Sequence, residues 1–351
     1  MGKASDFLLR FLGLKPNSSE ILSIQYLRGI ASLSVMLFHF TFAPEKMNEL
    51  SGIGYFIYII FSRMYLGVNI FFCISGFVLL YSLIKSNYTL SGFGNFLLRR
   101  ITRIEPPYML SVLLVVALAS MLAYLGKPVD KDISIQNILM HFGYLNTFTG
   151  GWLLDIYWTL AVEFVFYLSI GLAFPLVVGK SIIRYMLFGL FLASSPFMPH
   201  HSLPFFAPFF VIGMEACLLY TKKIERTEFL VFTCISLFLM LWVFEKGAFS
   251  FSTEGVIKAF LTLATVYYFF QKPKFSTWWY VLGTISYSLY LLHTIIGSAL
   301  VKVAKDDAFT SPKRIAVVLV AAIVSIVASL LYFKFVEKPS ISLSKKLIGK
   351  S

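Results

Sequence analysis

Long apolar stretches alternate with short polar connections along almost the whole chain. Each stretch is close to the roughly 20 residues that an α-helix needs to cross a bilayer. Its apolar residues follow one another without the alternation that a membrane-barrel strand would show. The pattern therefore predicts about ten transmembrane helices, at about 22–43, 64–84, 107–125, 153–178, 181–197, 203–221, 228–245, 255–271, 280–301 and 314–336.

Prolines crowd the junction between the fifth and sixth of these stretches. They are Pro196, Pro199, Pro204 and Pro208. Because proline lacks a backbone N–H and disrupts a helix interior, we expect a short or broken helical hairpin there.

The composition agrees with a membrane protein. Of the 351 residues, 58% are hydrophobic and only 13% are charged, whereas about a quarter of a soluble domain is charged. This excludes an ordinary soluble protein and predicts an all-α, polytopic membrane helix bundle. We expect a cytoplasmic or interfacial N-terminal segment at 1–21, a transmembrane domain at 22–336 and a cytoplasmic basic tail at 337–351.

The basic residues indicate how the bundle is oriented. The net charge is +13, from 30 lysines and arginines against 17 acidic residues. With Arg28 set aside inside the first apolar stretch, the remaining basic residues divide 19 to 10 between the two sides of the bundle. Since basic residues concentrate in cytoplasmic loops, we expect both termini in the cytoplasm. This distribution accounts for the basic charge without a nucleic-acid partner.

No metal site is expected. Cys73, Cys217 and Cys234 are scattered through apolar stretches and form neither a disulfide framework nor a metal-ligand cluster. They are interpreted as packing residues. His200 and His201 lie in the proline-rich turn, where histidines are usually solvated.

Two ionisable residues share the first apolar stretch. Arg28 and His39 are eleven positions apart in LRGIASLSVMLFH, which is about 16 Å along a helix axis. Ionisable groups inside a membrane are costly and usually functional. The arginine is expected near the cytoplasmic surface, and the histidine beyond the middle of the bilayer.

Two further ionisable residues fall at comparable depth. Counting helix rise from the predicted boundaries puts Glu163 and His293 near the level of His39. A histidine can take a proton from a hydroxyl, and a carboxylate can orient the imidazole. The alternative is a pair of buried histidines bonded to backbone carbonyls, with Glu163 paired to an arginine.

An arginine cluster precedes the third apolar stretch, in LLRRITRIEPPY. Arg99, Arg100 and Arg103 fall on or near one helical face, because residues three and four apart are neighbours. Guanidinium groups bind phosphates bidentately, so the cluster is a candidate dock for a phosphorylated cytosolic cofactor. The alternative is a topological signal that contacts lipid headgroups.

Together these motifs resemble the acyltransferase-3 family of integral membrane O-acyltransferases, whose members include exopolysaccharide, O-antigen and Nod-factor acetyltransferases. The resemblance extends over nearly the whole chain, and we expect a stand-alone member without the added extracytoplasmic domain of longer members. It rests on LRGIASLSVMLFH, GVNIFFCISGFVL, RRITRIEPPY, WTLAVEFVFYL, GTISYSLYLLH and FVEKP, in this order.

The resemblance implies a reaction and its catalytic residues. Family members transfer an acyl group, usually acetyl, from cytosolic acyl-CoA to a sugar hydroxyl of a cell-envelope or exported glycan. By this resemblance His39 is the catalytic base, Glu163 its partner, and His293 matches a histidine of the ninth family helix.

The resemblance also implies a donor site and partners. Arg28, Arg100 and Arg103 would bind the phosphates of acetyl-CoA, and no metal is involved. The expected partners are a glycan or lipid-linked saccharide acceptor, membrane lipids and polysaccharide assembly proteins, in a bacterial cytoplasmic (inner) membrane.

Two other functions fit the same residues. A proton-coupled transporter or lipid-linked glycan flippase would use the histidines and Glu163 to relay protons. A structural subunit of a polysaccharide export machine would bind no donor at all.

Overall fold

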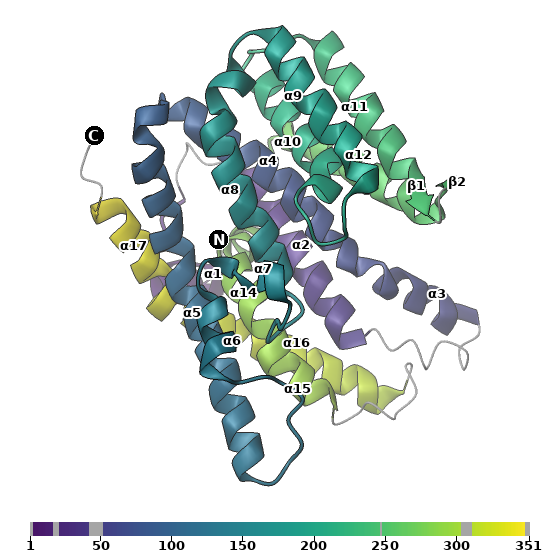
Figure 1. The fold of residues 1–351 in the computed structure, drawn as a ribbon. Helices are drawn as coiled ribbons and strands as arrows, with labels where there is room; N and C mark the ends of the chain where they lie inside the picture. Colours follow the sequence, from purple (N-terminus) through teal and green to yellow (C-terminus); the bar gives the residue numbers. More distant parts are fainter. Residues whose placement is uncertain (1–2, 17–20, 42–51, 246–247, 303–310, 348–351) are drawn as a thin grey trace.

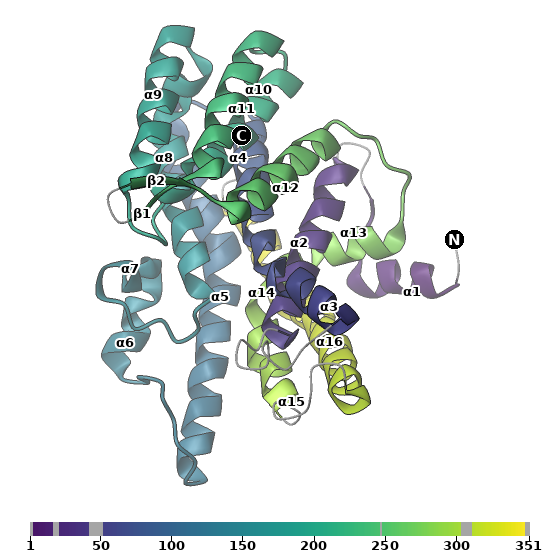
Figure 2. The same ribbon diagram turned by 90° about the vertical axis from the view of Figure 1, so that its right-hand side faces the viewer.

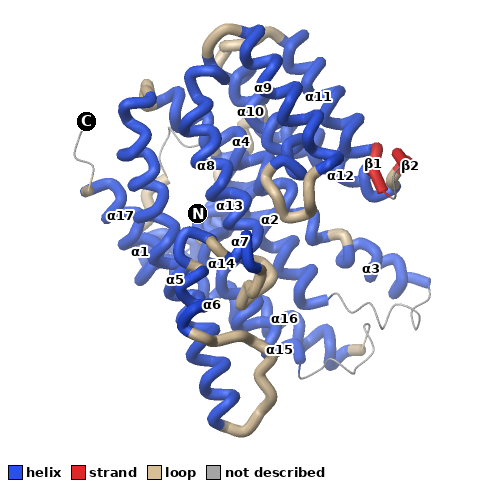
Figure 3. The backbone as a smooth tube through the Cα atoms, viewed as in Figure 1, coloured by secondary structure: helices blue, strands red, loops and turns tan. Residues whose placement is uncertain are grey.

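The computed structural model describes residues 3–16, 21–41, 52–245, 248–302 and 311–347, and these are helical almost throughout (Figures 1 and 3). The helices are α1 (Lys3–Leu12), α2 (Leu22–Thr41), α3 (Gly52–Ser62), α4 (Gly67–Lys85), α5 (Phe93–Tyr124), α6 (Ile135–Met140), α7 (Asn146–Thr149), α8 (Tyr157–Val178), α9 (Ser181–Ser194), α10 (Ala207–Tyr220), α11 (Arg226–Leu241), α12 (Thr253–Phe269), α13 (Thr277–Thr284), α14 (Ser286–Leu292), α15 (Ser298–Val301), α16 (Pro312–Tyr332) and α17 (Lys338–Lys346). The four terminal residues 348–351 of the expected basic tail lie outside the described part.

Every predicted apolar stretch is helical over most of its length, which confirms the helical class. Four described segments are long and apolar enough to cross a membrane: Gly52–Lys85, Leu90–Tyr124, Tyr157–Val178 and Pro312–Lys346. The bent succession of α13, α14 and α15, with 56° between its parts, would make a fifth. The count of ten spans is therefore supported only in part.

Two physical reasons explain part of the shorter count, and α11 and α12 are themselves short, with 16 and 17 residues. Gln25, Arg28 and His39 interrupt the apolar run of α2 with polar side chains. The prolines end α9 and delay α10, so that both are 14-residue helices with 3₁₀ turns beside the break. The expected broken hairpin is confirmed.

The apolar pattern also missed some elements. Strands β1 (Trp242–Glu245) and β2 (Ala248–Phe251) form a short antiparallel hairpin, although residues up to 245 were expected to be helical (Figure 3). Short apolar runs do not distinguish strand from helix. Helix α3 was not predicted, nor were α6 and α7 in the connection after α5.

The largest apolar core surrounds α4, which packs against α10, α2 and α8. The α4–α10 contact depends on glycine, since a Cβ atom at Gly76 or Gly213 would overlap the backbone of the opposite helix. Small residues allow such close approach of membrane helices. Figure 2 shows α8, α9, α10 and α11 grouped on one side, with α13 and α1 on the other.

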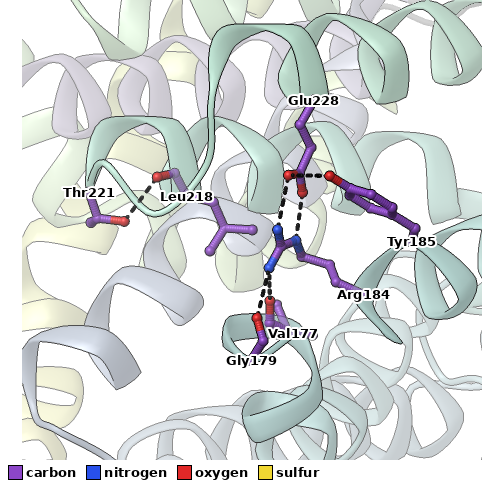
Figure 4. Close-up of polar contacts among 7 residues, drawn as sticks. All are labelled: Val177, Gly179, Arg184, Tyr185, Leu218, Thr221 and Glu228. Atoms are coloured by element: carbon purple, nitrogen blue, oxygen red, sulfur yellow. Dashed lines mark hydrogen bonds and ion pairs between the residues drawn. The ribbon is translucent and has the colours of Figure 1, made fainter. Parts of the chain in front are cut away.

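An ion pair fastens the group formed by α8, α9 and α11 (Figure 4). The guanidinium of Arg184 donates to both carboxylate oxygens of Glu228, at 2.6 and 2.9 Å. Its remaining terminal nitrogen donates to the carbonyls of Val177 and Gly179 at the end of α8. Arg184 thereby satisfies carbonyl groups that a helix end leaves without partners.

Two π-helical turns interrupt the helices around the centre. One covers His293–Gly297 between α14 and α15, and the other covers Phe333–Glu337 between α16 and α17. Pro339 has no N–H for the carbonyl four residues before it, which favours a widened turn there. Single π-turns are frequent at functional sites, and each of these carries an ionisable residue at one end.

Candidate active site

Three arginines and two glutamates line one cavity in the centre of the bundle. The cavity has a volume of about 130 Å³ and lies between α2, α4, α5, α8, α14 and the π-turn before α17. Its ionisable lining residues are Arg28, Arg100, Arg103, Glu163 and Glu337. The cavity volume is smaller than the roughly 300–1,000 Å³ of a typical ligand pocket, so only part of a large ligand fits inside.

Two of the arginines, Arg28 and Arg100, are held by polar and aromatic contacts. Nε of Arg28 donates to Oγ of Ser286 at 3.1 Å. The guanidinium of Arg100 lies 5.6 Å from the ring centre of Phe96 and 5.5 Å from that of Tyr167, within cation–π range.

Arg99 differs from its two neighbours in the motif. It is exposed and does not line the cavity, whereas Arg100 and Arg103 are half-buried and do. Arg100 and Arg103, which are three residues apart on α5, therefore both face the cavity, and Arg99 does not.

The carboxylates are bound by serines. Oγ of Ser75 donates to Glu163 at 2.7 Å, and Oγ of Ser288 donates to Glu337 at 2.6 Å. Among the described residues no carboxylate oxygen lies within 4.0 Å of a nitrogen of the three cavity arginines. The guanidinium groups therefore retain N–H donors that face the cavity.

The two predicted membrane histidines lie together. The ring centres of His39, near the end of α2, and His293, at the start of a π-turn, are 5.2 Å apart. Nδ1 of His293 donates to the carbonyl of Leu289 at 2.9 Å. Its Nε2 is buried and has no hydrogen-bond partner within the described part of the chain. Since Nδ1 carries the proton in this contact, Nε2 is an acceptor.

Tyr290 connects the cavity with the histidines. It lines the cavity, and its ring centre lies 5.9 Å from that of His293. Its hydroxyl donates to the carbonyl of Ile156 at 3.0 Å and lies 2.6 Å from the hydroxyl of Thr159. These contacts fix the ring between the two groups.

The structure therefore divides the predicted site residues into two groups. Arg28, Arg100, Arg103 and Glu163 line the cavity, and His39 and His293 form a pair that is not part of its lining. Glu163 was expected beside both histidines, but the structure places it among the arginines of the cavity instead. Its alternative, a direct arginine pair, is not formed either, since Ser75 is its bonded partner.

Sequence reasoning missed Glu337, which was placed at the start of the expected cytoplasmic tail. A carboxylate at the end of an apolar run is usually interfacial, so the FVEKP motif gave no physical sign of burial. Yet Glu337 is only 2% exposed and lines the cavity.

The described residues include no group of three or more His, Cys, Asp or Glu side chains that could hold a metal ion. Both turn histidines contact aromatic rings. The ring centre of His200 lies 4.3 Å from that of Phe205, with the rings tilted by 46°, and His201 stacks on Trp158 at 4.2 Å. Cys73 and Cys217 are buried and Cys234 is exposed, all as free thiols.

Comparison with known proteins agrees with the sequence resemblance. No curated protein and no solved structure matches the chain. The acyltransferase domain family Acyl_transf_3 matches residues 21–334, which include all of the site residues described above except Glu337. The chain therefore belongs to the acyltransferase-3 family.

Proposed function

We propose that this protein is a membrane O-acyltransferase that moves an acetyl group from acetyl-CoA to a hydroxyl of a cell-surface or exported glycan. The observation that carries the proposal is the division of α2. Arg28, near the start of α2, lines the arginine cavity. His39, near the end of the same helix, belongs to the histidine pair. One helix thus carries an anion-binding residue and a candidate base.

The arginine cavity is the proposed donor site. Arg28, Arg100 and Arg103 would bind the CoA phosphates, because guanidinium groups with free N–H donors suit phosphate oxygens. The adenosine end would remain outside on the cytoplasmic side. The narrow pantetheine arm would carry the thioester past Tyr290 toward His39.

The proposed transfer step is direct. The imidazole of His39 takes the proton from the acceptor hydroxyl, and the hydroxyl oxygen attacks the thioester carbonyl carbon. The carbon–sulfur bond then breaks, and the leaving CoA thiolate takes a proton from the imidazolium. His293 would orient His39 through its unoccupied Nε2, and Glu163 would balance the charge of the arginines.

The orientation of the protein is part of the proposal. We propose ten spans in a bacterial cytoplasmic membrane, with both termini in the cytoplasm. The connection after α5 and the connection between α10 and α11 lie at opposite ends of the molecule (Figures 1 and 2). This arrangement is the one that the distribution of basic residues requires. A glycan or lipid-linked saccharide would reach the histidine pair from the outer side.

Transfer of labelled acetyl from acetyl-CoA to a glycan acceptor by the purified protein tests this function. We expect label on the glycan and free CoA in equal amounts, and at least 100-fold less transfer by His39→Ala, since general base catalysis contributes about 10²–10⁴-fold. The matched control is His200→Ala, an exposed turn histidine, which should keep normal transfer.

The outcomes separate the competing functions. Normal transfer by His39→Ala would remove the base assignment, and label retained on the protein would replace direct transfer with an acyl-enzyme. A transporter or flippase would release no CoA and would show proton-dependent substrate uptake in vesicles instead.

A further inference from the structure

Glu337 is a buried carboxylate that the proposed transfer step does not use. It is 2% exposed and lines the arginine cavity. A carboxylate is costly to bury in an apolar bundle unless cations and hydrogen bonds compensate it. The hydrogen bond comes from Ser288 at 2.6 Å.

The compensating cations are Arg28 and Arg103, which line the same cavity as Glu337. Neither arginine approaches it within 4.0 Å in the described structure. The three groups therefore line one cavity of about 130 Å³ without a direct ion pair.

The neighbouring lysine does not neutralise Glu337. Nζ of Lys338 donates to the backbone carbonyls of Leu12 and Gly13, at 2.6 and 3.1 Å. It thus binds the end of α1 rather than the cavity. The π-turn Phe333–Glu337 and the bond from Ser288 together hold the Glu337 carboxylate toward the arginines.

We propose that Glu337 is the resident counter-anion of the arginine cluster and limits how tightly the cluster binds phosphate groups. The inference rests on the proposed donor site. A phosphate that enters the cavity neutralises the charges of Arg28 and Arg103, while the fixed carboxylate of Glu337 repels it. Glu337 therefore weakens the binding of donor and of product CoA alike, which favours release of CoA after transfer.

Binding of CoA and of pantetheine to the purified full-length protein tests this role. Glu337→Gln keeps the size of the side chain and an oxygen for Ser288 but removes the charge. We expect it to bind CoA roughly tenfold more tightly, as for one unit charge at intermediate dielectric. Pantetheine carries no phosphate, so its affinity should change less than twofold.

Two control variants keep the charge. Glu337→Asp and Ser288→Ala should bind CoA within about threefold of the unmodified protein, because each retains a carboxylate in the cavity. If the unmodified protein binds CoA but Glu337→Gln binds it no more tightly, or binds pantetheine more tightly to the same degree, this inference is wrong. If the unmodified protein binds neither CoA nor pyrophosphate, the donor site itself is wrong, and this inference fails with it.

Discussion

At the scale of single residues, the contacts of the arginines distinguish structural from ligand-binding roles. Arg184 meets Glu228 in a bidentate pair with side chains that are 4% and 8% exposed. The cavity arginines have no carboxylate at that distance among the described residues. A paired guanidinium stabilises the fold, and one without an anion is available for a ligand.

We therefore expect Arg184→Ala to destabilise the protein without changing its affinity for CoA. Breaking a buried pair leaves Glu228 uncompensated and costs about 3 kcal/mol or more. The control is Arg63→Ala, because Arg63 contacts Glu254 at 3.8 Å with side chains that are 43% and 33% exposed. Such a pair contributes about 1 kcal/mol or less. Unfolding in detergent measures both, and equal losses would contradict the assignment.

The sequence predicted the site residues that place a costly ionisable group inside an apolar run or repeat along one helical face. Arg28 and His39 stood out because both interrupt one apolar run, and Arg100 and Arg103 because they share a helical face. Glu337 could not be identified, since its burial depends on a π-turn and on Ser288, which is 49 residues away in sequence. The grouping of Glu163 with the arginines likewise depends on how α4 and α8 pack.

At the scale of elements, the same limit applies. The apolar stretches located the helices because the length of a continuous apolar run is a local property of the sequence. The π-turns and the hairpin of β1 and β2 depend on backbone pairing that apolar composition does not specify. Close contacts between helices, such as that of α4 with α10, depend on single glycines.

Gly213 tests this contact. A Cβ atom there would overlap the backbone carbonyl of Cys73 in α4, so we expect Gly213→Ala to lower the free energy of unfolding by about 1–3 kcal/mol. In the matched control Gly189→Ala, the added Cβ meets no atom within 4 Å. That variant should be neutral or more stable by up to about 1 kcal/mol. If both variants unfold like the unmodified protein, α4 and α10 do not pack this closely.

At the scale of the whole molecule, the proposed mechanism requires a defined orientation. The arginine cavity must open to the cytoplasm, where CoA is found, and the histidine pair must be reachable by the acceptor. The bundle separates the two groups along α2, and the distribution of basic residues along the sequence predicts which end faces the cytoplasm.

Labelling with a membrane-impermeant maleimide in intact cells tests the orientation. Lys127→Cys, in the connection after α5, should be labelled, and Lys345→Cys, near the end of α17, should react only after permeabilisation. Both positions are exposed, and the unmodified protein with its three native cysteines gives the background. Labelling of Lys345→Cys in intact cells would place the arginine cavity on the wrong side for CoA.

The central claim is that donor binding and proton transfer belong to separate groups on the same helix bundle. Acetyl transfer by Arg103→Ala and His39→Ala, measured over a wide range of acetyl-CoA concentration, tests it most directly. We expect Arg103→Ala to regain much of the normal rate at high acetyl-CoA, because it has lost donor affinity. His39→Ala should remain at least 100-fold slower at every concentration, because it lacks the base. Recovery of His39→Ala at high acetyl-CoA, or the same concentration dependence in both variants, would contradict the claim.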